Sequence, residues 1–426
     1  MRTTWWGNMA GRYDRAIWIR LIGTALTTVA NFMIRPFMVL YLYDKLEGSV
    51  LLPMLIVGLQ PLSSMLVGLW GGGLADRYGR KPLMAGALVV NMAAMAGFVF
   101  AEELWHFALF SVLNGVGMSL FFPAANAQVA DIVEPDRRAE VFAALHAALN
   151  VGAAFGPMLG LLVFTWQPKV VFALSAVTFA AYLLLVLRYI PETLPKPIPG
   201  GAPDGERGAA GPPAAAPAER LGLRGHGLLF ALTGLALPIG LLYAQVETVL
   251  PLHLQSTFAD DYTLILTTML SLNGLTVMLL QIPVARRTEH WATHRVVLLS
   301  YGLLAAVALG YGFAPWFALL LLAELLFSFG EMLSGPHLQK AVSLIAPEHM
   351  RGRYFSVYSM NWQLARGLGP IAFGVVFERF GGAFAFSVIA ALLAVSGGAQ
   401  YALVRRIAKP RMPAAANVSS AAAAEA

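Results

Sequence analysis

Cysteine is missing from all 426 residues of the sequence. Its absence excludes disulfides, thiolate metal sites and thiol catalysis. The eight histidines show no spacing typical of metal ligands, and no Gly-x-x-x-x-Gly-Lys-Ser/Thr segment is present to hold a nucleotide phosphate. We therefore expect no metal and no cofactor, and neither ATP-driven nor enzymatic chemistry.

Charged residues are scarce as well. They make up 12% of the chain, against 58% hydrophobic residues, and the mean hydropathy is +0.67. Such a composition holds more apolar side chain than a soluble fold can bury, so the chain is predicted to lie in a lipid bilayer. The net charge of +6 does not indicate a nucleic-acid partner, because the basic residues do not gather on one face with interleaved aromatic residues.

Long apolar runs, each near the ~20 residues needed to cross a bilayer, recur along the chain. Lipid admits only helices and closed barrels, and these runs are too long for barrel strands. The predicted fold is an all-α membrane protein with twelve transmembrane helices in two pseudo-symmetric six-helix bundles. The runs cover 16–43, 50–74, 82–101, 105–130, 140–164, 169–189, 227–254, 262–284, 295–313, 315–340, 353–377 and 383–406.

Four residues of the first half return in the second half at a constant separation of 213 positions. A single offset for glycine, proline and phenylalanine predicts a duplicated six-helix unit, with parallel repeats about an axis along the membrane normal. The pairs are Pro123 and Pro336, Phe142 and Phe355, Gly156 and Gly369, and Pro157 and Pro370.

Composition also divides the chain into parts. Residues 1–190 are expected to form the N-terminal bundle and 223–406 the C-terminal bundle. The segment 191–222 is rich in Pro, Gly and Ala, which predicts a flexible cytoplasmic linker, and 407–426 is predicted to be a disordered tail.

The lysines and arginines outside the apolar runs fix the expected orientation. With both termini in the cytoplasm, all of them fall inside except Lys45, Lys169 and Arg379. This asymmetry satisfies the positive-inside rule and accounts for the basic character of the chain. We expect a multi-pass protein of the cell (inner) membrane.

The densest polar segment of the chain separates the second and third runs and is expected to be a very short loop. It reads Gly72-Gly73-Leu74-Ala75-Asp76-Arg77-Tyr78-Gly79-Arg80-Lys81. Its glycines at 72 and 79 allow a close backbone approach or a positive φ. Asp76 lies among three cations, which favours a carboxylate held by charge-assisted hydrogen bonds.

This segment is similar to the signature loop of the major facilitator superfamily. In the fifth run, Gly152-x-x-x-Gly156-Pro157-x-x-Gly160 resembles the antiporter motif of the twelve-helix drug/proton antiporters, with Leu161 in place of a second terminal glycine. The resemblance implies a secondary transporter whose two bundles rock around a central cavity. Two departures stand out: Ser111 occupies the place of an arginine linked to proton coupling, and 285–290 does not repeat the signature.

The resemblance also implies that the signature segment is a conformational latch in the outward-open state. Asp76 is expected to face the positive N-terminal end of the eleventh helix. The alternative is a charged turn that obeys the positive-inside rule, which suffices for Arg77 and Lys81. The complete set of latch candidates is Gly72, Asp76, Arg77, Gly79, Arg80, Asp131, Arg137 and Arg138.

Five ionisable residues inside the apolar runs are the candidate site for proton and substrate: Arg35, Glu247, Glu324, Glu331 and Arg366. Each costs at least ~2.5 kcal/mol at mid-bilayer unless it faces protein or water. Helices one, four, seven and ten line the cavity in the resembled family. Glu324 and Glu331, two turns apart, share one helix face. We rank Glu331 first because Arg366 is expected near it, and the alternative is a static carboxylate bonded to a neighbouring helix.

Aligning the repeats pairs Arg35 with Glu247 within one residue of the offset. Equivalent positions of helices one and seven are therefore expected to face each other in the outer half of the cavity. Such an ion pair could be a gate or a substrate contact, or it could be static, with Arg35 bound to a backbone carbonyl.

The predicted function is proton-coupled export of amphipathic small molecules, cationic or neutral, by alternating access, from a monomeric protein. The alternative is a metabolite, sugar or lipid transporter of the same fold, with symport as one of its modes. Acidic residues in the seventh and tenth helices favour cations, and the motif of the fifth helix favours antiport.

Overall fold

The computed structural model describes residues 14–46, 48–134, 138–193, 223–347 and 350–408. For some residues within these ranges, among them Gly72, Asp76 and Arg138, only the backbone is described. Arg137, most of the predicted linker and the predicted tail lie outside the described residues.

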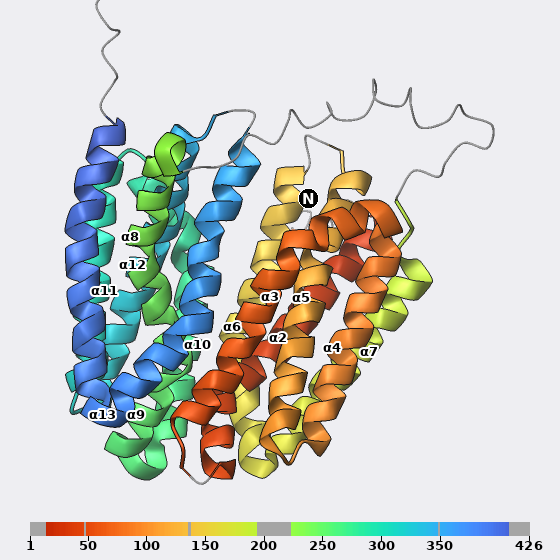
Figure 1. Ribbon diagram of the computed structural model, residues 1–426, viewed down its shortest axis with the longest axis horizontal. Helices are drawn as coiled ribbons and strands as arrows, with labels where there is room; N and C mark the ends of the chain where they lie inside the picture. Colours follow the sequence, from red (N-terminus) through yellow and green to blue (C-terminus); the bar gives the residue numbers. More distant parts are fainter. Residues whose placement is uncertain (1–13, 47, 135–137, 194–222, 348–349, 409–426) are drawn as a thin grey trace, which may run out of the picture.

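Every regular element in the described ranges is helical, which confirms the predicted all-α class (Figure 1). The first bundle holds α2 (Arg15–Lys45), α3 (Leu51–Tyr78), α4 (Arg80–Phe100), α5 (Leu104–Ile132), α6 (Arg138–Trp166) and α7 (Pro168–Tyr189). The second holds α8 (Leu223–Glu247), α9 (Val249–Phe258), the short η2 (Ala259–Asp261), α10 (Tyr262–Thr288), α11 (Thr293–Phe313), α12 (Phe317–Ile345) and α13 (Arg351–Ala408).

Two irregular positions in the backbone explain how the helices listed above correspond to twelve membrane crossings. The α8 and α9 helices follow one another as a single span, interrupted at Thr248. The long α13 contains two spans, because Gly381 adopts φ 79° and reverses the chain. The described part of the chain therefore contains the twelve predicted spans, ten of them as separate apolar segments and the last two within one long segment.

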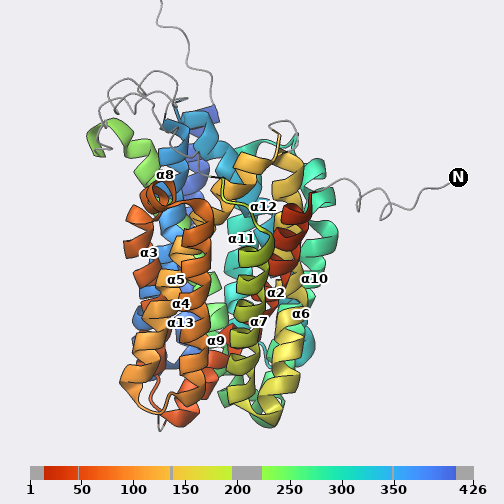
Figure 2. The same ribbon diagram turned by 90° about the vertical axis from the view of Figure 1, so that its right-hand side faces the viewer.

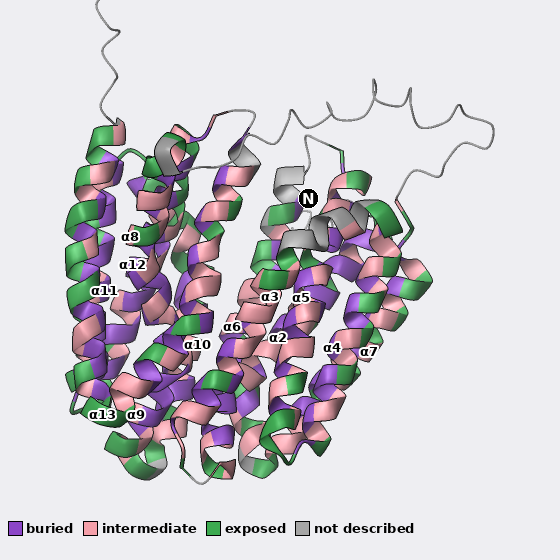
Figure 3. Cartoon of the chain, viewed as in Figure 1, coloured by how far each residue is buried: buried purple, intermediate pink, exposed green. Residues whose placement is uncertain are grey.

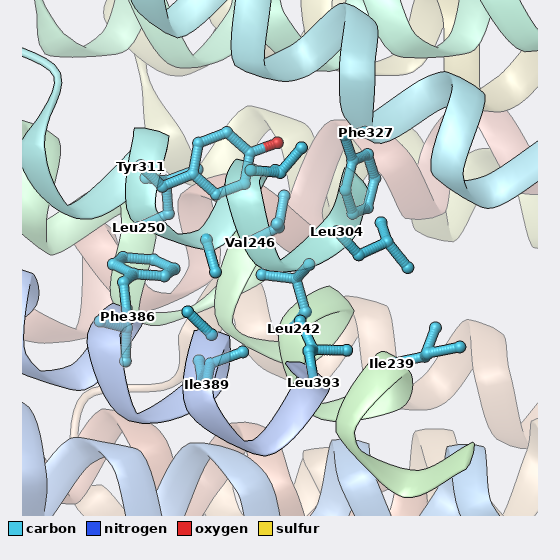
Figure 4. Close-up of a cluster of buried hydrophobic side chains, with 14 of the residues drawn as sticks. Ile239, Leu242, Val246, Leu250, Leu304, Tyr311, Phe327, Phe386, Ile389 and Leu393 are labelled. Carbon is cyan, nitrogen blue, oxygen red and sulfur yellow. The ribbon is translucent and has the colours of Figure 1, made fainter. Parts of the chain in front are cut away.

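The helices are apolar on both sides, and this decides how they pack. Large side chains such as Leu162 and Val395 remain 66% and 74% exposed on the outer faces, where lipid is their suitable neighbour. Figure 3 shows exposed residues along the outside of the bundles and buried ones turned inward. Within the second bundle, Leu242, Tyr311, Phe327 and others pack into one core (Figure 4).

The bundles meet along two helix pairs. The α3 helix packs on α13, and α6 packs on α10; Figure 2 shows the two pairs on opposite sides of the molecule. The second helix of each bundle thus meets the fifth helix of the other. A two-fold axis between the bundles exchanges these two contacts, which agrees with the predicted pseudo-symmetry.

The bundles are not equally close along their length. We define the terminal face as the face at which the described chain begins (Arg15) and ends (Ala408), and the other as the opposite face. The close contacts between α3 and α13 lie in the half of α3 near the opposite face, where Gly58 adjoins Gly367 and Met54 adjoins Gly374. Toward the terminal face the bundles diverge (Figure 1).

The prediction of a loop over the signature segment was wrong. The α3 helix continues through Tyr78 and α4 begins at Arg80, so Gly79 alone separates them. Residues 74–78 contain no helix breaker, and the helix continues past the apolar run. Gly79 makes the turn with φ 100°, and a Cβ there would lie 2.6 Å from Glu192 Oε2, so glycine is required.

Candidate functional site

A cavity of about 520 Å³ lies between the bundles and is lined by both. Its walls combine polar side chains, aromatic rings and the ionisable residues predicted from sequence. The first bundle contributes, among others, Thr24, Thr28, Asn31, Phe32, Arg35, Asn91, Phe122 and Asn150, and the second Tyr243, Glu247, Asn273, Glu324, Phe327, Glu331, Trp362 and Arg366. A smaller adjoining cavity of about 210 Å³ extends among α2, α3 and α5 and shares Arg35, Glu247 and Arg366.

The structure brings Arg35, Glu247 and Arg366 together as a central charged cluster. Arg35 Nη1 lies 3.4 Å and Arg366 Nη2 2.8 Å from the same oxygen, Glu247 Oε1. The three side chains are between 21% and 29% exposed, so they face the cavity without being open to bulk solvent. Because Arg35 belongs to α2 and the other two to α8 and α13, this cluster joins the two bundles.

Glu324 and Glu331 also line the cavity, on the α12 wall. Glu324 is fully buried, and the Tyr311 hydroxyl donates to its Oε2 at 2.5 Å. Glu331 is half-buried and accepts from Asn273 Nδ2 at 3.1 Å. Arg366 was expected near Glu331, but its guanidinium donates to Glu247. Its positive charge reaches Glu331 electrostatically, without forming an ion pair with it.

An aromatic wall adjoins the two acids. The Tyr243 ring lies 4.7 Å from the Phe327 ring and 4.9 Å from the Trp362 ring, centroid to centroid. Carboxylates beside aromatic faces attract organic cations, because the ring face carries partial negative charge and the rings also bury apolar surface.

A second group of charges, the terminal charged cluster, is formed by Arg80, Asp131 and Glu192. Arg80 Nε donates to Asp131 Oδ2 at 3.1 Å, and Thr193 Oγ1 donates to the same oxygen at 2.7 Å. The Glu192 carboxylate accepts from the backbone N–H groups of Arg80 and Lys81, both at 3.1 Å. An anion at this point compensates the unpaired N–H groups and the positive end of α4.

The remaining latch candidates are less defined. Arg77 is exposed, with its guanidinium 5.4 Å from the Tyr78 ring centre. Gly72, Asp76 and Arg138 have a described backbone only, and Arg137 lies outside the described residues. The proposed contact of Asp76 with the eleventh helix therefore stays a prediction.

The glycines of the antiporter-like motif form the face of α6 that packs on α2. A side chain at Gly152, Gly156 or Gly160 would collide with α2 at Thr28, Phe32 and Met33 respectively. Pro157 lies within the same helix. Close helix packing accounts for the glycines, and their role in antiport stays a prediction.

Three residues that contact the candidate site residues were missed from sequence: Glu192, Asn273 and Tyr311. Glu192 follows directly on the apolar run of α7, and an acid at that boundary next to Pro191 was the available indication. Asn273 is an amide within an apolar run, a residue type that usually bonds across helices. Nothing in the sequence distinguishes Tyr311, because a tyrosine in an apolar helix is ordinarily a packing residue.

Two helical bundles around a shared polar cavity define a membrane transporter. The Major Facilitator Superfamily family model matches residues 20–370 and 248–424. The chain therefore belongs to this superfamily and is an integral membrane transporter, not an enzyme, as the motifs predicted.

Curated relatives match either most of the chain or part of it. The uncharacterized MFS-type transporter YhjO of Bacillus subtilis is 34% identical over 92% of this chain and 93% of its own length. The Na(+), Li(+), K(+)/H(+) antiporter of Planococcus maritimus is 28% identical over 90% and 95%. The multidrug resistance protein MdtH of Klebsiella pneumoniae is 28% identical over 40% of this chain and 42% of its own.

Proposed function

We propose that the protein exports amphipathic small molecules, cationic or neutral, in exchange for protons, by alternating access. The observation that carries this proposal is the cavity shared by both bundles, in which Glu324 and Glu331 adjoin the aromatic wall of Tyr243, Phe327 and Trp362. An antiporter and a multidrug resistance protein among the relatives support it.

The proposal places the terminal face in the cytoplasm of a cell whose membrane holds a proton gradient. The distribution of lysine and arginine supports this orientation. With that orientation, a conformation in which the bundles diverge at the terminal face (Figure 1) would be inward-facing, and cargo would enter from the cytoplasm. The bundles, 1–190 and 223–406, move as units joined by the 191–222 linker within one monomer.

In the alternating cycle, the central charged cluster holds the two bundles together on the outer side of the cavity. Arg35 of the first bundle and Glu247 of the second must separate when the opposite face opens. Cargo or proton binding beside the cluster supplies the free energy difference between the two states, since a ligand shifts an equilibrium only by its differential affinity.

The test is reconstitution into liposomes with an imposed proton gradient and the fluorescent cation ethidium as cargo. We expect ethidium to accumulate against its gradient when the cargo-receiving side is acidic, and a protonophore to abolish the accumulation. The double variant Glu324→Gln, Glu331→Gln is the matched control, because it removes both acids at nearly constant volume. Transport that ignores the proton gradient would overturn the proposal.

A second candidate follows from the charge of the central cluster. Two guanidiniums share one carboxylate, which leaves a cation for a cargo that carries an anionic group. A metabolite, or a lipid with such a group, would then be the cargo, in symport with protons. Competition of ethidium binding by sugars, lipids and organic acids separates the candidates, since selective competition by one metabolite favours the second.

A further inference from the structure

Glu324 differs from every other cavity acid in how little compensates its charge. Its side chain is fully buried, and one oxygen, Oε1, is buried without a hydrogen-bond partner. The other oxygen accepts from Tyr311, which Figure 4 shows beside Phe327 in the core of the second bundle. None of the ion pairs among the described residues includes Glu324.

The titratable groups around Glu324 come from four helices, and none of them neutralises it. Tyr311 of α11 donates its hydroxyl, and Tyr243 of α8 lies within electrostatic reach. Glu331, seven residues further along α12, is an acid and opposes a second negative charge. The cation of α13, Arg366, is bonded to Glu247.

Glu331 has the opposite surroundings. It is half-buried, and Asn273 of α10 donates an N–H to it, as suits an ionised acceptor. The same Asn273 amide group reaches Ser328 Oγ at 3.0 Å, and Ser328 in turn donates to the Glu324 carbonyl oxygen. The two acids therefore have different surroundings: Glu324 is enclosed by protein, and Glu331 is open to the cavity.

We infer that Glu324 carries the exchanged proton, whereas Glu331 contacts the cationic cargo. An ionised carboxylate with an unpartnered buried oxygen is costly, so Glu324 is stable with its O–H bond formed. When it releases the proton, the new negative charge opposes that of Glu331 until a cation enters. Proton release and cargo entry are thereby coupled. This inference rests on the proposed proton-coupled export.

The experiment compares two transport modes in liposomes. Ethidium counterflow, an exchange of cargo for cargo at equal pH, needs no proton transfer, whereas accumulation driven by a pH difference does. For Glu324→Gln, assayed at ethidium concentrations that saturate the variant, we expect counterflow to persist and gradient-driven accumulation to be lost completely. Ethidium affinity should also lose its dependence on pH.

Glu331→Gln is the matched control, because it makes the same substitution one cavity position away. We expect it to weaken ethidium affinity at least fivefold while the remaining affinity still depends on pH. Tyr311→Phe removes the donor of Glu324 at constant ring volume. It should retain counterflow and move the midpoint of the pH profile of ethidium binding upward, because the ionised carboxylate loses its hydrogen bond.

Gradient-driven accumulation that survives Glu324→Gln would overturn the assignment and leave the proposed function intact. Loss of counterflow in folded Glu324→Gln would also overturn it, since Glu324 would then contact cargo. Should that variant not fold, an unmoved pH profile in Tyr311→Phe would overturn the assignment equally. A wild-type protein that ignores the proton gradient would instead contradict the proposed function itself.

Discussion

The central and terminal charged clusters contain similar residues but join different parts of the molecule. In the central cluster, Glu247 of the second bundle accepts from Arg35 of the first, so its ion pair crosses between bundles. In the terminal cluster, the bonds of Arg80 to Asp131 and of Glu192 to the α4 N-terminus stay within the first bundle.

This difference shows which contacts stabilise the present conformation. Contacts between the bundles lie at the cavity, where Arg35 pairs with Glu247, and toward the opposite face, where Gly58 of α3 approaches Gly367 of α13 so closely that no side chain fits. At the terminal face, the bonds given above for the terminal cluster join parts of the first bundle to one another. A state open at the opposite face must therefore exchange the first kind of contact for new ones at the terminal face.

The largest effect is expected from a side chain placed in the seam between bundles. In Gly58→Leu, the Cβ alone would lie 2.5 Å from the Gly367 carbonyl oxygen. Overpacking of about 1–3 kcal/mol would disfavour closure of the opposite face by about 5- to 150-fold and nearly abolish transport. Because the chain has no cysteine, a single cysteine introduced into the cavity can report its accessibility from each side.

Gly86→Leu is the control for that variant, since a Cβ at Gly86 meets nothing within 4 Å. It should transport normally. Equal losses in both variants would mean that the α3–α13 approach is not the closure contact.

The next largest effect is expected from Glu247→Gln, which removes the shared negative charge and leaves two guanidiniums facing each other without it. We expect a cost of about 1–3 kcal/mol to the present conformation, less than for a fully buried pair, and roughly tenfold slower ethidium export. Transport rate and thermal stability in detergent are the measurements.

A charge exchange sharpens this test. The double variant Arg35→Glu, Glu247→Arg restores a pair between the same helices and should recover part of the activity that each single change loses. If the activity losses of the two single variants simply add in the double variant, the ion pair between the bundles has no role in transport.

A smaller effect is expected from Asp76→Asn in the signature segment. If Asp76 meets the N-terminal end of the eleventh helix in the outward-open state, losing its charge costs about 0.3–1 kcal/mol, enough to slow export up to about fivefold. Membrane levels should stay near normal, as measured by immunoblotting. Unchanged export would remove Asp76 from the latch.

The smallest effect is expected from Glu192→Gln, because its bonds to the N-terminus of α4 do not cross between the bundles. The amide keeps an acceptor for the α4 N-terminus but loses the charge, at about 0.3–1 kcal/mol of stability. The melting temperature should fall slightly and export should stay within about twofold. A loss as large as that of Asp76→Asn would show that the terminal cluster takes part in switching as well.

Contacts that follow from the internal repeat could be predicted from the sequence, whereas contacts that depend on helix packing could not. The pairing of Arg35 with Glu247 was predictable because a duplicated unit places equivalent positions opposite each other. Arg366 as the second partner of Glu247 was not, since its distance from α8 depends on how α13 packs. Residues 72–78 were misread as a loop because polarity was taken as the end of the helix.

Hydropathy and repeat offsets are local or periodic properties, so the twelve spans, the duplication and the residues that carry charge within the bilayer follow from the sequence alone. Which of these charges meet depends on how the helices pack. Glu324 and Glu331 are the same residue type two turns apart on one helix, yet α11 encloses the first with Tyr311 while α10 offers Asn273 to the second. That distinction arises from neighbours far away in the chain, whose positions are set by helix packing.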